Sequence, residues 1–273
     1  MFTFTHAGKL GDILYSLYYC LEVSRSFHFD KFNYDIQVNK KISDFDEKCD
    51  SEEILLTRKD AEFIRPLLKS LPYVNDVTVG GIPGSETIDL NSFRRRDISP
   101  YGCEIRDWYY MSSPRTFPRE FWKRLIQVEP NPKYRDRILF TLTERYVNIA
   151  IDYKQLEQFR EHLVFIGTDR EYHTFQEQYF ELERAELTEK DDLLTVAQYL
   201  GGAKGYMANQ SCFFSLAELM KINRILLSPD WVRNEDGEVK IGPKNNLPLG
   251  GWCSSVSMTW KMVSAVRELL KME

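Results

Sequence analysis

Residues 6–14 read His-Ala-Gly-Lys-Leu-Gly-Asp-Ile-Leu and follow a short apolar run. Leucines then recur at helical spacing over residues 10–21. This order predicts a strand, a tight loop that contains Gly8 and Gly11, and a helix with Asp12 in its first turn. A strand that passes through a short loop into a helix is typical of an α/β protein.

The predicted loop has the features of a binding turn. Glycines let another molecule approach the backbone closely, and the free N–H groups of a helix start attract anions. The stretch lacks the third glycine of a dinucleotide-binding fingerprint, and it is not a phosphate loop because Lys9 precedes Gly11. The alternative is an ordinary turn in which Asp12 only stabilises its own helix.

The composition is that of an ordinary globular chain. The 273 residues are 43% hydrophobic and 28% charged, with a net charge of −5 and a pI near 5.6. An acidic chain argues against nucleic acid as the main partner, because duplex binding needs a basic surface. No stretch is long and apolar enough to span a membrane, so any membrane contact is expected to be peripheral.

The five cysteines are scattered and form no Cys-x-x-Cys pair, and no signal peptide precedes the first strand. These features predict a cytoplasmic protein without a disulfide framework or a zinc site. Asp44-Phe45-Asp46 matches the Asp-x-Asp pattern of metal-dependent sugar transferases, but it falls in a polar loop, so we interpret it as coincidence. No metal site and no cofactor are predicted.

The first half of the chain mixes regular and irregular segments. Its predicted elements are strands at residues 32–38 and 74–79, a helix from a Thr57–Asp60 capping box to Leu71, an irregular stretch at 91–118 and a short helix at 120–128. Within the irregular stretch, Arg94-Arg95-Arg96 is interpreted as a solvated face, with a docking patch for an anionic acceptor or a membrane surface as the alternative. His6 and Lys9 are expected to line a cleft.

The second half alternates strand and helix more regularly. Its predicted strands lie at 138–142, 163–166, 180–187, 206–208 and 224–227, its helices at 153–162, 169–179, 190–200, 211–221 and 255–272, and a long loop at 229–253. The stiff Pro130-Asn131-Pro132 segment suggests a boundary, so we predict lobes at residues 1–132 and 133–273. The fold class is α/β, with two Rossmann-like lobes, a ligand cleft between them, and the last helix packing back toward the first lobe.

Three strand-to-helix junctions of the second half carry polar residues. Thr143 and Arg145 follow the first strand, and an arginine there can form a fork to a diphosphate. Glu171 follows the second strand and can accept hydrogen bonds from ribose hydroxyls. The alternatives are a surface arginine and an acid that stabilises a helix dipole.

The third junction is Asn209-Gln210-Ser211, where Ser211 is a good N-cap and the helix start can hold phosphate. A plain capped helix is the alternative. Because the carboxyl ends of parallel strands share one edge of a sheet, the three junctions are expected to converge.

With these residues in view, the chain resembles the GT-B glycosyltransferases of family 9, the heptosyltransferase-like group. The resemblance is carried by Gly8-Lys9-Leu10-Gly11-Asp12-Ile13-Leu14-Tyr15-Ser16-Leu17, by Val164-Phe165-Ile166-Gly167 with Glu171, and by Tyr206-Met207-Ala208-Asn209-Gln210-Ser211 followed by Ser215-Leu216-Ala217-Glu218. It implies two Rossmann-like lobes, a nucleotide-sugar donor on the second, and a metal-independent, inverting transfer to a hydroxyl of a glycan or other acceptor.

The resemblance also implies roles for single residues. Asp12 matches the general base. The donor-contact positions fall on Gln210, Ser211 and Ser215, Glu171 matches the donor acid, and Thr143 and Arg145 lie where phosphate is bound.

Three positions depart from the pattern of the family. Gln210 stands where an aspartate is usual, Cys212 where a glycine is usual and Ser215 where a histidine is usual. These departures leave open a nucleotide-sugar-binding protein that has lost turnover. A dinucleotide-dependent oxidoreductase is a second alternative, ranked below the first.

Overall fold

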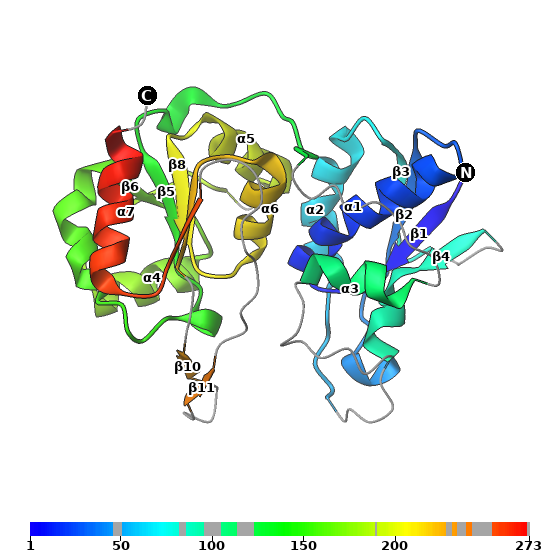
Figure 1. The fold of residues 1–273 in the computed structure, drawn as a ribbon, viewed down its shortest axis with the longest axis horizontal. Helices are drawn as coiled ribbons and strands as arrows, with labels where there is room; N and C mark the ends of the chain where they lie inside the picture. Colours follow the sequence, from blue (N-terminus) through cyan, green and yellow to red (C-terminus); the bar gives the residue numbers. More distant parts are fainter. Residues whose placement is uncertain are drawn as a thin grey trace. The chain divides into compact units, whose positions relative to one another are not determined.

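The computed structural model describes residues 1–45, 51–81, 86–95, 105–113, 123–188, 190–227, 231–233, 239–241 and 253–271. The chain divides into two compact units (Figure 1). Unit 1 comprises Met1–Gln127 with Asp191–Thr195, and unit 2 comprises Val128–Lys190 with Val196–Glu273. Each unit is described by itself below.

Unit 1 is built on a four-stranded parallel sheet with the strand order β3-β2-β1-β4. Its elements are β1 (Thr3–His6), α1 (Leu10–Ser26), β2 (Phe32–Ile36), η1 (Ile42–Asp44), α2 (Arg58–Ser70), β3 (Val74–Val79), β4 (Thr87–Asp89), η2 (Leu90–Arg95) and α3 (Ile105–Ser112), where η denotes a 3-10 helix. Because β1 lies between β2 and β4, the turn that follows β1 meets the residues that follow β4.

Helix α1 is buried on all sides along its middle, from Ile13 to Ser24. Its side chains there are mostly apolar or aromatic, which suits a helix that is enclosed rather than half exposed. It packs against α3 and α2. A helix held on several sides gives the residues of its first turn a rigid base.

Unit 2 carries a six-stranded parallel sheet with the strand order β12-β9-β8-β5-β6-β7. Its elements in chain order are η3 (Pro132–Tyr134), β5 (Ile138–Thr141), η4 (Glu144–Tyr146), η5 (Tyr153–His162), β6 (Leu163–Phe165), α4 (Asp169–Gln178), β7 (Glu183–Arg184), α5 (Leu193–Gly202), β8 (Gly205–Ala208), α6 (Cys212–Met220), β9 (Arg224–Leu227), the antiparallel pair β10 (Trp231–Arg233) and β11 (Val239–Ile241), β12 (Cys253–Val256) and α7 (Thr259–Lys271).

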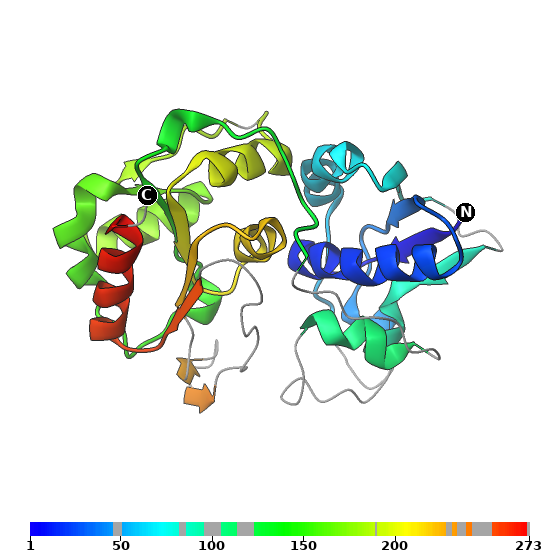
Figure 2. The same cartoon turned by 45° about the horizontal axis from the view of Figure 1, so that its top comes forward.

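Helices cover both faces of this second sheet. Figures 1 and 2 show α4 and α7 on one face and α5 and α6 on the other. The face under α7 and α4 holds a cluster of buried aromatic and aliphatic residues that includes Phe140, Phe165 and Phe175. The ring of Phe140 meets those of the other two edge-on, with centroids 5.8 and 5.2 Å away. This core fixes the carboxyl ends of β5 and β6.

The two parallel sheets confirm the predicted α/β class, and most predicted elements are present. The predicted helix at 120–128 is wrong in its described part, since residues 123–128 form no helix. The irregular stretch at 91–118 contains α3, and the last helix begins at Thr259 because β12 takes the residues before it. The ligand cleft, the lobe boundary at residue 132 and the packing of the last helix toward the first lobe stay predictions.

Candidate functional site

The turn between β1 and α1 is shorter than predicted. Helix α1 begins at Leu10, so Gly11 belongs to its first turn and not to the loop. Lys9 is the N-cap and offers no side-chain hydrogen bond to the helix. Asp12 Oδ2 instead accepts a hydrogen bond of 3.2 Å from the backbone N–H of Lys9. Asp12 therefore does stabilise its helix, as the plainer interpretation of the motif expected.

Arg94 gives Asp12 a second partner. Its guanidinium Nη2 lies 2.7 Å from Asp12 Oδ2, and the side chains of Arg94 and Asp12 are only 14% and 15% exposed. The interpretation of Arg94 as part of a solvated face is therefore wrong. Arg96 and the side chain of Arg95 lie outside the described residues. Asp12 Oδ1 has no hydrogen-bond partner within the described part of the chain, which leaves one carboxylate oxygen available.

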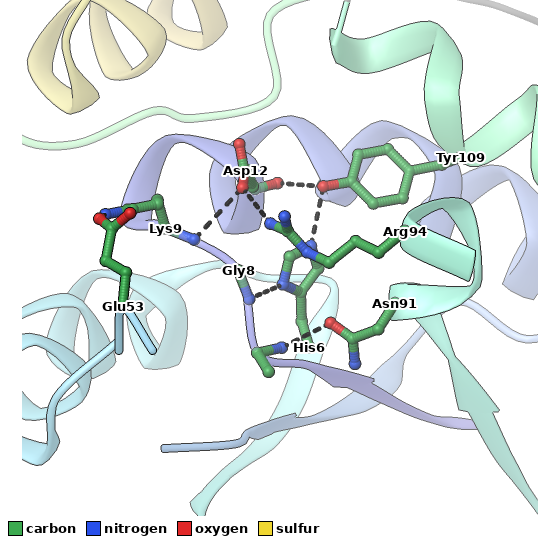
Figure 3. Close-up of polar contacts among 9 residues, drawn as sticks. His6, Gly8, Lys9, Asp12, Glu53, Asn91, Arg94 and Tyr109 are labelled. Atoms are coloured by element: carbon green, nitrogen blue, oxygen red, sulfur yellow. Dashed lines mark hydrogen bonds and ion pairs between the residues drawn. The ribbon is translucent and has the colours of Figure 1, made fainter. Parts of the chain in front are cut away.

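A second set of contacts reaches Asp12 through its backbone (Figure 3). The imidazole of His6 is fully buried, and its Nδ1 accepts a hydrogen bond of 2.6 Å from the N–H of Gly8. The proton of the neutral ring is therefore on Nε2, which lies 2.8 Å from the Tyr109 hydroxyl. That hydroxyl in turn donates to the backbone carbonyl of Asp12 at 2.7 Å.

The protonation states agree with this direction of donation. Burial, with a smaller contribution from the positive charge of Arg94, lowers the pKa of the His6 imidazole well below its ordinary value. Burial also raises the pKa of the Tyr109 phenol well above its ordinary value. His6 is therefore neutral and Tyr109 keeps its proton. Because His6 is buried, its link to the Asp12 backbone is the Tyr109 hydroxyl and not a solvent molecule.

Gly8 is required at this turn for space. A Cβ atom on residue 8 would lie 2.2 Å from His6 Cε1 and 2.9 Å from Asp12 Oδ2. The close approach expected from the motif is thus made by side chains of the protein itself. Asn91 closes the same turn, because its Oδ1 accepts a 2.9 Å hydrogen bond from the N–H of Ala7. Lys9 points to Glu53, with which it forms an ion pair.

In unit 2, Thr143 and Asn209 are brought together as predicted from the sheet edge. Asn209 is fully buried. Its Oδ1 accepts from the N–H of Thr143 at 2.9 Å and its Nδ2 donates to the carbonyl of Thr143 at 2.7 Å. The Asn209 amide and the Thr143 backbone are hydrogen-bond partners for each other, and these two bonds hold the ends of β5 and β8 together.

The other residues of the third junction lie at the start of α6. Ser211 is the N-cap, and its hydroxyl accepts from the N–H of Phe214 at 3.1 Å. The Ser215 hydroxyl donates to the carbonyl of Ser211 at 3.3 Å, and Gln210 lies between Asn209 and this cap. These contacts match a capped helix, and the N–H groups at the helix start keep their affinity for an anion.

A pocket of about 330 Å³ opens beside the second junction. Apolar walls come from residues that include Phe175 and Tyr179, and polar groups come from Glu171, Thr174 and Gln178. Glu171 Oε2 also accepts hydrogen bonds from the N–H and the hydroxyl of Thr168, at 2.9 and 2.8 Å. The pocket was not predicted from the sequence, although Glu171 was named as a donor-binding residue.

Glu144 lines the same pocket and is held by two neighbours. Arg170 donates to both of its carboxylate oxygens, at 3.0 and 2.7 Å, and the Thr174 hydroxyl donates at 3.2 Å. Arg145 follows Glu144 on η4. The side chain of Arg145 lies outside the described part of the structure, so its predicted contact with phosphate stays a prediction.

The described ranges contain neither a metal-ligand cluster nor a membrane-spanning helix. No three His, Cys, Asp or Glu side chains there gather as a metal ion would need. Asp46 of the Asp-x-Asp pattern lies outside those ranges. Among the helices of the described segments, none has the length and apolar character that crossing a bilayer demands.

Known proteins resemble this chain in structure and not in sequence. No protein-family model and no curated protein matches it. A family 9 glycosyltransferase from Veillonella parvula DSM 2008 matches with a TM-score of 0.59 and 11% identity, over 100% of this chain and 89% of the other. The E. coli ADP-heptose LPS heptosyltransferase II matches with a TM-score of 0.59 and 11% identity, over 99% and 98%.

A third solved structure, the E. coli heptosyltransferase WaaC with ADP, matches with a TM-score of 0.53 and 11% identity, over 99% of this chain and 100% of the other. At such identities the likeness establishes the fold. The chain therefore has the fold of the family 9 glycosyltransferases, as the sequence motifs predicted.

Proposed function

We propose that this protein is a metal-independent, inverting glycosyltransferase that moves a sugar from a nucleotide-diphosphate sugar to a hydroxyl of a glycan or other acceptor. The observation that carries the proposal is the Asp12 carboxylate, which is fixed at one oxygen and open at the other. The shared fold supports it, since the neighbouring structures are glycosyltransferases.

In this proposal, Asp12 Oδ1 takes the proton of the acceptor hydroxyl. The acceptor oxygen then forms a bond to the anomeric carbon while the bond to the nucleoside diphosphate breaks, and a single displacement inverts the configuration. A positioned general base of this kind contributes about 10²- to 10⁴-fold to the rate. The leaving group gains negative charge, and Arg145 and the N–H groups at the start of α6 are the candidates to stabilise it.

The pocket of unit 2 is the candidate nucleoside site. Its volume lies at the lower end of the range of small-molecule sites, and it combines apolar walls with a few polar groups. The half-buried Tyr179 offers a ring surface for a base, and Glu171 offers a carboxylate for ribose hydroxyls. None of the described residues that line the pocket is basic, so in this proposal the phosphates lie outside it.

One observation favours the alternative of a nucleotide-sugar-binding protein without turnover. Gln210 stands where an aspartate is usual in the family that the chain resembles, so this position lacks a charge that the resemblance assigns to the donor site. Binding and turnover must therefore be measured separately.

The test begins with thermal unfolding in the presence of ADP, UDP, GDP, their sugar conjugates, NAD and FAD. A ligand that binds only the folded state at 100 times its Kd adds about 2.7 kcal/mol of stability. We expect a nucleoside diphosphate or its sugar to stabilise the protein. Stabilisation by NAD or FAD alone would favour the oxidoreductase and contradict the proposal.

Turnover is then followed as release of the nucleoside diphosphate from the best donor, with a panel of glycan acceptors and with EDTA present. We expect release to continue in EDTA. Release that stops in EDTA and returns with Mn²⁺ would contradict the metal-independent mechanism. Binding without release in any condition would establish the inactive alternative.

A further inference from the structure

Three α-helices of the described segments begin with the same local arrangement, which the short 3-10 helix η1 also has, with Asp44 accepting from the N–H of Lys41 at 2.9 Å. Asp12 of α1, Asp60 of α2 and Glu171 of α4 each occupy the third helical position, and each accepts a hydrogen bond from the N–H of its own N-cap residue. The distances are 3.2, 3.0 and 2.9 Å respectively. In all three a single carboxylate oxygen takes that bond.

The second donor to this oxygen differs between the three helices. At Asp60 and Glu171 it is the hydroxyl of the N-cap threonine, at 2.6 and 2.8 Å. At Asp12 the N-cap is Lys9, which has no hydroxyl, and the second donor is Arg94 at 2.7 Å. A local, neutral donor is thus replaced by a charged one from a segment 82 residues away.

This exchange costs the helix an N-cap side chain. A serine, threonine, aspartate or asparagine at an N-cap stabilises a helix by about 0.5–2 kcal/mol over an alanine, and lysine offers no equivalent acceptor. Positions where local stability is given up are expected to be functional. The arrangement leaves Oδ2 with two donors and Oδ1 with none among the described residues.

The backbone of Asp12 is fixed by a separate contact. Tyr109 donates to its carbonyl, and His6 determines the direction of that hydrogen bond by donating to Tyr109. The ring of Tyr109 packs edge-on against Phe93, with centroids 5.3 Å apart, and Phe93 is the neighbour of Arg94. Both contacts to Asp12 therefore come from the segment that follows β4.

We propose that Arg94 and Tyr109 are positioning residues for Asp12, the first holding its carboxylate and the second its backbone, so that Oδ1 faces the acceptor hydroxyl. The inference rests on the proposed function of Asp12 as the base. Misplacement of a catalytic group by about 1 Å can cost ~10²-fold in rate. Arg94→Gln removes the charged donor to Asp12 Oδ2 together with the cation over the Phe93 ring, and Tyr109→Phe removes the donor to the Asp12 carbonyl together with the acceptor for His6 Nε2–H.

The main test is a double-mutant cycle on turnover with ADP-heptose, or with the best donor of the thermal screen. Arg94→Gln should lower kcat by about 10- to 100-fold and leave the donor KM unchanged, since it disturbs only the geometry of the base. Arg94→Lys should recover part of the loss, because it keeps one charged donor but not the planar fork. Tyr109→Phe should lower kcat by about tenfold through lost orientation.

The same substitutions are then made in the Asp12→Asn background. If Arg94 and Tyr109 act through Asp12, each should change the residual turnover by less than about twofold, because the interacting effects are not additive. Equal losses in both backgrounds would overturn the inference and leave the proposed function standing. Full turnover in Asp12→Asn alone would instead overturn the proposed function.

A crystal structure of Arg94→Gln provides a readout that needs no substrate. We expect α1 to keep its position while the Asp12 carboxylate occupies more than one rotamer. A single, unchanged carboxylate conformation would overturn the role of Arg94 whatever the turnover shows. The matched control for Asp12→Asn is Asp60→Asn. Asp60 occupies the same helix position, and the described contacts of its carboxylate come from Thr57 in its own turn.

Discussion

The turn at Asp12 and the turn at Glu171 share the same local arrangement, but they differ in the contacts that residues distant in sequence make with them. Both place an acid at the third position of a helix that follows a strand of a parallel sheet. Glu171 completes its hydrogen bonds with the neighbouring Thr168 and borders an open pocket. Asp12 completes its own with Arg94, and its backbone carbonyl accepts a hydrogen bond from the buried Tyr109. The local motif fixes a carboxylate, and the distant contacts decide its use.

The largest effect is expected for Asp12→Asn. The substitution is nearly isosteric and removes the proposed base, so we expect turnover to fall by about 10²- to 10⁴-fold while the donor still binds. Asp60→Asn should leave turnover unchanged, because Asp60 occupies the same helix position as Asp12 but has no role in the proposed reaction. Turnover near the wild-type level in Asp12→Asn would make the two turns equivalent and end the comparison.

The next effect is on stability, at the edge of the second sheet. Asn209→Ala leaves the N–H and carbonyl of the half-buried Thr143 without their partner, and we expect the free energy of unfolding to drop by about 1–3 kcal/mol. Asn75→Ala, which removes an exposed amide, is the control. Urea unfolding measures both. Equal stabilities would show that the Thr143–Asn209 contact does not hold β5 to β8.

A smaller effect is expected for Glu171→Gln, which keeps an acceptor for Thr168 and removes the charge. We expect binding of the best nucleotide to weaken about tenfold, the value of one charge-assisted hydrogen bond. Glu177→Gln is the control on the same helix, because Glu177 is exposed and does not line the pocket. Calorimetry that finds equal affinities for both variants would place the nucleoside elsewhere.

The smallest effect concerns pH. The pKa of His6 is lowered in the folded protein from its ordinary value of 6.5, so below that pH the unfolded chain binds a proton that the folded chain does not. Stability should therefore fall as the pH drops below about 6.5, by at most ~1.4 kcal/mol per pH unit for this proton. His6→Gln should remove that part of the slope, and the exposed His173→Gln should not. Parallel slopes in all three proteins would contradict a buried neutral ring.

Local patterns were sufficient for most of the fold. The capping box at Thr57 and Asp60 and the strand at Val74–Val79 were predicted correctly because neighbouring residues determine them. The short strands β4 and β12 were not predicted, since three or four residues carry too little periodicity. Each exists because a parallel neighbour, β1 or β9, supplies its hydrogen bonds.

The same division applies to the candidate site. Asp12, Gly8 and Glu171 could be named because a strand, a short loop and a helix start are visible in sequence. Arg94 could have been suspected only from its place in a triple arginine, and nothing local marks Tyr109. Their contacts to Asp12 span 82 and 97 residues, and such pairings depend on the order of strands in the sheet.

During synthesis, β1 and α1 leave the ribosome long before β4, and the N-terminal part of a chain begins to fold first. Until Thr87–Asp89 pairs with it, β1 is the edge of the growing sheet, with N–H and C=O groups open to other strands. Over the same interval Asp12 stands in its turn without Arg94 or Tyr109. A nascent or cleaved chain that stops before residue 87 thus contains the whole motif but lacks Arg94 and Tyr109. In the proposed mechanism, such a chain cannot orient Asp12 for turnover.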